Sequence, residues 1–193
     1  MATRIQVIAV ACFTTLAAIY FFIPSAAVLS GMTTELAKTT GDLDVRISGQ
    51  PSPSQLEVTI RNSHPSQTIT LLSWDTPFDP QAINSGVLCL ENAKTGEEVQ
   101  SPGMKLNRKL PPPREDLIEI SAGSTVTKNI ALDAPWIPAD GQDYRVHYQG
   151  SWRAMWAKSA AQITDEELAS FTGDAGLQGG FSSDKIEVRL NTH

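Results

Sequence analysis

Histidines, serines and paired acids are the side chains of this 193-residue chain that could carry out hydrolysis. The three histidines are His64, His147 and His193, and none lies in an H-E-x-x-H sequence. That spacing would place two imidazoles and a glutamate base around zinc on one helix face. No G-x-S-x-G sequence is present to place a serine nucleophile on a sharp turn. The sequence therefore predicts no metal site, no cofactor and no catalytic residues.

The acidic pairs and the glycine-rich segment have simpler interpretations. Asp42 with Asp44, and Glu97 with Glu98, are expected to be solvated turn or strand residues. The glycine-rich segment 173–180 leads into a predicted strand rather than a helix, so it lacks the context of a phosphate-binding loop. We therefore predict that the protein is not an enzyme.

A basic segment stands out in a chain whose formal net charge is −6. Three consecutive prolines at 111–113, which favour an extended polyproline conformation, lie among its cationic side chains. These side chains belong to Lys105, Arg108, Lys109 and Arg114. Two interpretations remain open: an exposed, solvated hairpin turn, or a preorganised arm that docks on an acidic or aromatic-lined partner.

Three tryptophans, Trp136, Trp152 and Trp156, form the second group of candidate contacts. The composition of residues 152–161 predicts a helix, on which Trp152 and Trp156 would share a face. Packing against the domain is the first expectation for these rings. The alternative is an exposed aromatic platform that binds a sugar or a partner.

Two apolar runs joined by a proline-containing loop lie at the centre of the chain. Residues 69–74 and 87–90 are apolar on both faces and predict buried strands. The loop opens with a structural turn in which acidic and hydroxyl oxygens accept from backbone N–H groups and a proline ends the strand. This turn consists of Trp74, Asp75, Thr76 and Pro77, with Trp74 expected in the core.

The two cysteines have different expected positions. Cys12 lies in the apolar amino-terminal segment, whereas Cys89 lies beside Val87 on a predicted strand. A chain that has lost its amino-terminal segment would hold one cysteine and no internal disulfide. Alternation places Cys89 on a buried strand face, so we predict an unreactive structural thiol.

Alternating apolar and polar residues predict most of the remaining fold. Short strands follow one another, and we expect hairpins to join 56–61 with 68–74 and 117–120 with 126–132. A capping box, Thr164 to Glu167, predicts a short helix near the end of the chain. The pattern indicates a mostly β, immunoglobulin-like antiparallel sandwich of seven to eight strands, with a helical insertion at about 152–180 before the last strand.

The amino terminus predicts export. Arg4 precedes the apolar residues 5–23, and small residues follow at 25–27. We expect a signal peptide at 1–27, a lead-in at 28–42 and one domain at 43–193, in a secreted, extracellular protein. An uncleaved membrane anchor is the alternative, and only then would a membrane be a partner. The acidic balance excludes nucleic acid as a partner.

The central turn also carries a resemblance. Residues 74–78 followed by 86–88, and later 99–113 and 117–124, resemble the amino-terminal pro-region of fungal deuterolysin-type (aspzincin) zinc metalloendopeptidases, over roughly 43–148. The catalytic domain is missing from the match, and the 152–180 insertion departs from the family pattern. The resemblance implies a free-standing pro-region that acts as inhibitor or folding partner of a secreted metalloendopeptidase.

Two hypotheses for function follow. The first is a non-catalytic, exported β-sandwich that binds a secreted protease or another extracellular protein. The alternative is a carbohydrate- or cell-surface-binding module that uses its tryptophans.

Overall fold

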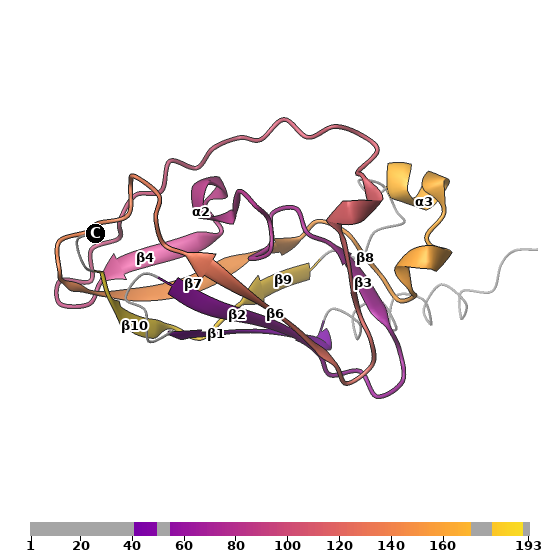
Figure 1. The fold of residues 1–193 in the computed structure, drawn as a ribbon, viewed down its shortest axis with the longest axis horizontal. Helices are drawn as coiled ribbons and strands as arrows, with labels where there is room; N and C mark the ends of the chain where they lie inside the picture. The colour runs from indigo at the N-terminus through magenta and orange to yellow at the C-terminus, as the bar shows by residue number, and fades with distance from the viewer. Residues whose placement is uncertain (1–40, 50–54, 171–178, 191–193) are drawn as a thin grey trace, which may run out of the picture.

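The computed structural model describes residues 41–49, 55–170 and 179–190, and in these ranges the chain forms three antiparallel sheets (Figure 1). The sheet orders are β1-β2-β6, β10-β7-β4 with β9 also paired to β7, and β5-β3-β8. The elements, in chain order, are β1 (Leu43–Gly49), β2 (Gln55–Asn62), β3 (Ile69–Leu72), α2 (Ala82–Ser85), β4 (Leu88–Asn92), η1 (Arg114–Asp116), β5 (Leu117–Ile120), β6 (Thr125–Ala131), β7 (Asp143–Trp152), β8 (Met155–Trp156), η2 (Ala160–Gln162), α3 (Asp165–Ala169), β9 (Gly179–Ser182) and β10 (Ile186–Arg189).

The core lies between the sheets, as period-two alternation predicts. In β2, Leu56, Val58 and Ile60 have no exposed surface, while the residues between them face outward. In β7, the alternate residues Val146 and Tyr148 are buried against the same core cluster. Side chains on one face of each strand therefore meet across the sandwich. The mostly β, antiparallel sandwich predicted from the sequence is confirmed.

Both predicted hairpins are wrong, because in each case the chain changes sheets between the two strands. β2 pairs with β1 and β6, whereas β3 pairs with β5 and β8. β5 and β6 likewise belong to different sheets. Sequence alternation marks strands but carries no information on which strand is the partner.

A buried asparagine fixes the first of these crossings. The Asn62 side chain has no exposed surface, and its Nδ2 donates to the carbonyls of Gln67 (2.8 Å) and Ile120 (2.9 Å). Its Oδ1 accepts from the His64 N–H (3.0 Å). One amide thus holds the crossing loop to the end of β5, which gives polar backbone groups partners where no sheet reaches them.

The predicted helix over 152–161 is wrong. Trp152 instead ends β7, and Met155–Trp156 form β8, which pairs with Leu71 and Thr70 of β3. Trp152, Met155 and Trp156 are 1%, 0% and 4% exposed. A segment buried on successive residues has no solvent-facing stripe, and the edge of β3 offers it backbone hydrogen bonds.

The remainder of the insertion agrees with its capping signal. α3 begins after Thr164, whose Oγ1 accepts from the Glu167 N–H (3.2 Å). The Glu167 Oε2 accepts in return from the Thr164 N–H (2.9 Å). β8 lies inside the predicted insertion and β9 begins at its end, and they raise the strands of the described ranges to ten. The strand expected over 97–100 is reduced to one bridge, Glu91 to Glu98.

Some predictions fall outside the described residues. These are the leader 1–27, nearly all of the lead-in 28–42, and most of the glycine-rich segment 173–180. Within the described ranges, every helix is too short or too polar to span a bilayer.

We predict that Asn62→Ala destabilises the domain by about 3 kcal/mol, because two buried carbonyls and one N–H lose their partner together. Urea denaturation followed by fluorescence measures the loss. Thr127→Ala, which removes only an exposed hydroxyl contact to Thr59, should change stability by less than about 0.5 kcal/mol. Equal effects of the two changes would contradict the role given to Asn62.

Candidate functional site

The basic segment predicted from the sequence is a long connection without helix or strand, which we call the strap (residues 101–113). Figure 1 shows it crossing above α2 to reach η1. The expected hairpin does not form, because residues 105–108 pair with no strand in the described structure. The strap is therefore held mainly by its side chains, together with one backbone hydrogen bond from the Met104 N–H to the Asn84 carbonyl (2.8 Å).

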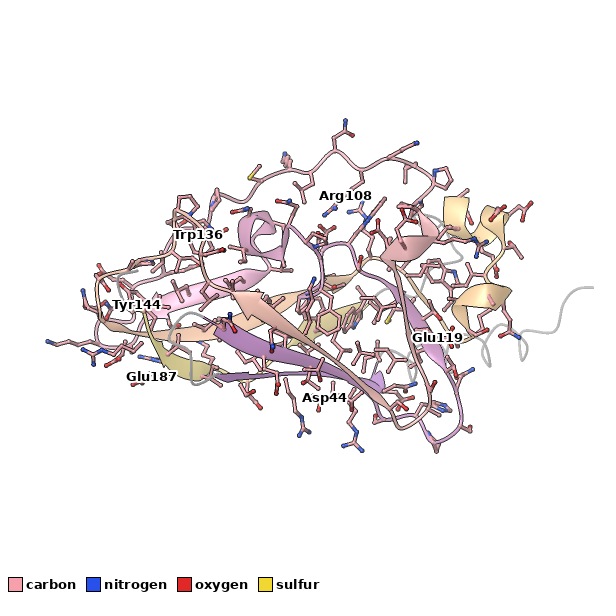
Figure 2. All side chains as sticks on the ribbon, viewed as in Figure 1. Asp44, Arg108, Glu119, Trp136, Tyr144 and Glu187 are labelled. Carbon is pink, nitrogen blue, oxygen red and sulfur yellow. The ribbon has the colours of Figure 1, made fainter. Side chains whose placement is uncertain are left out.

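Its central anchor is a buried ion pair. Arg108 points from the strap into the domain (Figure 2), and its Nη2 contacts the Oδ2 of Asp79. The Asp79 side chain is fully buried and also accepts from the N–H groups of Asp75 (2.8 Å) and Gln81 (2.9 Å). The Arg108 guanidinium lies 5.3 Å from the centroid of the Trp74 ring, within the range of a cation–π contact.

Trp74 is a core residue, as predicted. It is 3% exposed, and its Nε1 donates to the Oδ2 of Asp116 (2.6 Å) in η1, which follows the strap. Its ring also packs in a second core cluster that contains Leu72 and Trp156. The same side chain thus supports the strap from below and joins it to β3 and β8.

The turn after Trp74 forms as expected in outline. The Thr76 hydroxyl donates to the Ser73 carbonyl (2.6 Å) and accepts from the Phe78 N–H (3.1 Å). Asp75 adopts a left-handed conformation (φ 57°), which aspartate tolerates better than most residues. Its carboxylate contacts Arg153 (3.1 Å) rather than a backbone N–H.

The other end of the strap is fixed by Arg114. Its Nη2 donates to the Ile163 carbonyl (2.9 Å) and to the Asp165 Oδ1 (2.6 Å), which ties η1 to the start of α3. The guanidinium groups of Arg108 and Arg114 are both paired within the domain. We therefore assign these two residues to anchoring the strap rather than to contacting a partner.

The outer surface of the strap combines positive charge with apolar side chains. Lys105 and Lys109 are exposed, and no ion pair engages either of them among the residues that the structure describes. Met104 and Leu110 are 50% and 58% exposed. No acidic residue occurs between residues 99 and 114, so this surface is locally basic in an acidic protein.

A groove of about 410 Å³ runs along the strap. Its lining joins the strap to the Trp74 turn, to α2 and to the end of β7. Charged side chains of both signs lie in it: Lys105 and Arg108 from the strap, and the Asp75–Arg153 pair opposite. The arrangement provides a surface with charges and apolar groups, but no nucleophile beside a general base.

The predicted aromatic platform does not form. Trp152 packs on Phe181 with ring centroids 4.5 Å apart, and Trp156 lies in the second core cluster with Trp74. Trp136 is half-buried against the main core (Figure 2). The platform required a shared helix face, and the β conformation of this segment turns Trp152 and Trp156 into core residues instead.

A pocket of about 550 Å³ that contains titratable side chains lies on the outer face of β4 and β7. The sequence alone did not reveal it. Cys89 and His147 are directly opposite each other in the β4–β7 register, with Glu91 and Glu98 beside them. Cys89 is half-buried rather than buried, because its strand face looks into this pocket. Alternation in the two strands places both Cys89 and His147 on outward-facing positions. That signal would have brought them together only if the pairing of β4 with β7 had been known.

The chemistry of this pocket does not favour catalysis. Burial, and then the charge of Glu98, raise the pKa of the Cys89 thiol. Burial, and then the charge of Lys185, lower the pKa of His147. A neutral thiol opposite a neutral imidazole is the reverse of the activated thiolate–imidazolium pair of cysteine hydrolases. No group of three His, Cys, Asp or Glu residues in the described ranges is placed to hold a metal ion.

Comparison with known proteins identifies the class. The chain matches the family of the immunoglobulin-like domain over residues 42–190 and belongs to that family. It is also 34% identical over 139 residues to a protein of Arthroderma benhamiae (strain ATCC MYA-4681 / CBS 112371) named "Uncharacterized secreted protein". The match covers 70% of this chain and 69% of that relative. The chain is a secreted protein with an immunoglobulin-like domain, as predicted.

We predict that Arg108→Met lowers the free energy of unfolding by about 3 kcal/mol, because a buried carboxylate loses its counter-charge but keeps two backbone N–H donors. Urea denaturation provides the measurement. Arg46→Met breaks the exposed pair with Asp44 and should cost less than about 1 kcal/mol. If the two losses are similar, Arg108 does not anchor the strap.

We also predict that Cys89 reacts with iodoacetamide at pH 7 more slowly than an unstructured peptide carrying the same residues. Its raised pKa reduces the thiolate fraction at that pH, and its half-buried position limits access. Mass spectrometry of the Cys89 peptide gives the rate in the native protein and after unfolding in urea. If Cys89 reacts with iodoacetamide as fast in the native protein as in the unfolded protein, the pocket does not protect the thiol.

Proposed function

We propose that this secreted domain is a non-catalytic protein-binding module that contacts its partner through the strap. The observation that carries the proposal is the strap itself. It is anchored through Arg108 and Arg114, yet it presents Lys105, Lys109 and two exposed apolar side chains to solvent. The resemblance to metalloendopeptidase pro-regions supports a secreted protease as the partner, with another extracellular protein as the broader case.

Rigidity makes the strap suited to binding. An exposed loop normally loses conformational entropy when it docks, and that loss subtracts from affinity. Here the Asp79 and Trp74 contacts at its centre and the Arg114 contacts at its end are formed before any partner arrives. Pro113, with φ −68° and ψ 149°, adds an extended, stiff connection to η1.

Charge defines the kind of surface that the partner offers. Two ammonium groups on an otherwise acidic protein accelerate encounter with an acidic surface and repel a basic one. The exposed Met104 and Leu110 then require apolar side chains within that surface. The carbohydrate-binding alternative has less support, because two of the three tryptophans on which it depends are buried.

The test compares two charge-reversal variants on immobilised protein exposed to culture medium of the source organism. We predict that Lys105→Glu with Lys109→Glu reduces capture of a partner retained by the wild type, and that added salt weakens the wild-type complex. Arg61→Glu with Lys94→Glu makes the same change in net charge on exposed positions away from the strap. This control pair should bind as the wild type does.

A partner held equally by both charge-reversed proteins would exclude the strap as its contact. The protease hypothesis has a separate measurement: zinc endopeptidase activity of the medium is assayed with and without the purified domain. Inhibition that disappears in the strap variant and persists in the control variant supports a pro-region-like role. Unchanged activity, together with a captured protein of another kind, restricts the proposal to general protein binding.

A further inference from the structure

Strand β7 is longer than its neighbour β4. β4 pairs with residues 144–148 of β7, while β9 pairs with residues 149–152 on the opposite edge (Figure 1). The chain leaves the β4 side at Gly86, whose left-handed φ of 86° ends α2. The last four residues of β7 are therefore covered by a strand on one edge only, within the residues described.

Backbone directions show that the uncovered edge presents hydrogen-bonding groups. The Gln149 N–H donates to Val87 on the β4 side (3.0 Å), and the Tyr148 carbonyl accepts from Ser183 on the β9 side (2.9 Å). Groups alternate between the two edges along a strand, so the N–H and C=O of Ser151 face the β4 side. Among the described residues, no backbone hydrogen bond across that edge reaches them or the Gln149 carbonyl.

A groove of about 440 Å³ lies along this edge. Residues 149–153 form one wall, Ser85 and Gly86 form the other, and the Asp75–Arg153 pair lies at its end. Trp152 also lines the groove, and its buried Nε1 has no acceptor in the described chain. The groove shares Asp75, Ser85 and Arg153 with the groove along the strap, so the two are continuous.

We propose that the open edge of β7 at Gln149–Ser151 accepts an extended segment of a partner protein as an added β-strand. The Ser151 N–H donates to the segment, and the Ser151 and Gln149 carbonyls accept from it, which gives the segment its backbone hydrogen bonds. The added strand continues the line of β4 past Val87. This inference rests on the proposed protein-binding function and names the form of the ligand.

The surroundings define the sequence that such a segment carries. Val87 and Phe181 already fill the space beside Gly150, where the Cβ of any larger residue would lie 2.8 Å from each of them. Position 150 therefore requires glycine, which is common in a strand where another backbone approaches closely. At the strap end, Lys105 lines the continuous groove, so acidic residues are favoured there.

The test begins with short random peptides displayed on phage and selected on the wild-type protein. Each selected peptide is synthesised in two methylated forms. One form carries N-methyl groups on the odd-numbered residues, and the other carries them on the even-numbered residues; we call these forms the two phases. An added strand uses the N–H groups of alternate residues, so one phase should lose about tenfold or more in affinity and the other should bind nearly normally. Hydrogen exchange of the Ser151 amide should slow when the unmodified peptide binds.

Variants of the protein give the second half of the test. Ser151→Pro removes the donor that faces the groove and should abolish peptide binding, whereas Ser151→Ala keeps the backbone and should not change it. A melting curve establishes whether the proline variant folds, and the methylated peptides decide the matter on wild-type protein if it does not. Equal binding of both methylated phases, an unchanged Ser151 exchange rate, or no enriched peptide overturns the proposal.

The strap and the open edge can fail separately. Loss of binding in Ser151→Pro with normal binding in the Lys105→Glu, Lys109→Glu protein supports the added strand and removes the strap from the contact. The reverse result supports the strap and overturns the added strand. If a captured partner is unaffected by either change, both proposals fail.

Discussion

A carboxylate with no access to water must find its hydrogen-bond and charge partners inside the protein. Asp79 is such a carboxylate, and its partners come from the turn after Trp74, the approach to α2 and the strap. Its two oxygens accept from the backbone of Asp75 and Gln81 and from Arg108. The first two contacts shape the turn after Trp74 and the approach to α2. The third brings the strap across the domain. An unpaired charge at this depth would cost several kcal/mol, so turn and strap are stabilised together.

That anchoring joins the second core cluster to the candidate contact surface. Trp74 packs with Trp156 and Leu72 on its lower side and lies under Arg108 on its upper side. Arg114 then connects the end of the strap to the loop before α3. The insertion between β7 and β9, which the immunoglobulin-like pattern does not require, is thereby used to hold the strap in place.

Local signals in the sequence were sufficient for the elements and insufficient for their partners. The alternation in β2 and the capping box at Thr164 each depend on neighbours in the chain, and both were predicted correctly. The Arg108–Asp79 contact joins residues 29 positions apart, and no periodicity predicts it. The pairing of β8 with β3, the crossing held by Asn62, and the meeting of Cys89 with His147 are likewise long-range. Helical composition at 152–161 was overridden by burial against β3, because tertiary contacts outweigh weak local propensity.

The strap separates the residues that hold it from the residues that it displays. Arg108 contacts the buried Asp79, and Arg114, although exposed, is held by hydrogen bonds to Ile163 and Asp165, whereas Met104, Lys105 and Lys109 extend into solvent. Substitution at such exposed positions usually changes stability by less than about 0.5 kcal/mol. If the strap binds a partner as proposed, mutations in this part of it alter recognition while leaving the fold intact. One scaffold then diversifies its specificity at these positions over evolutionary time, much as antigen-binding loops vary on a constant framework.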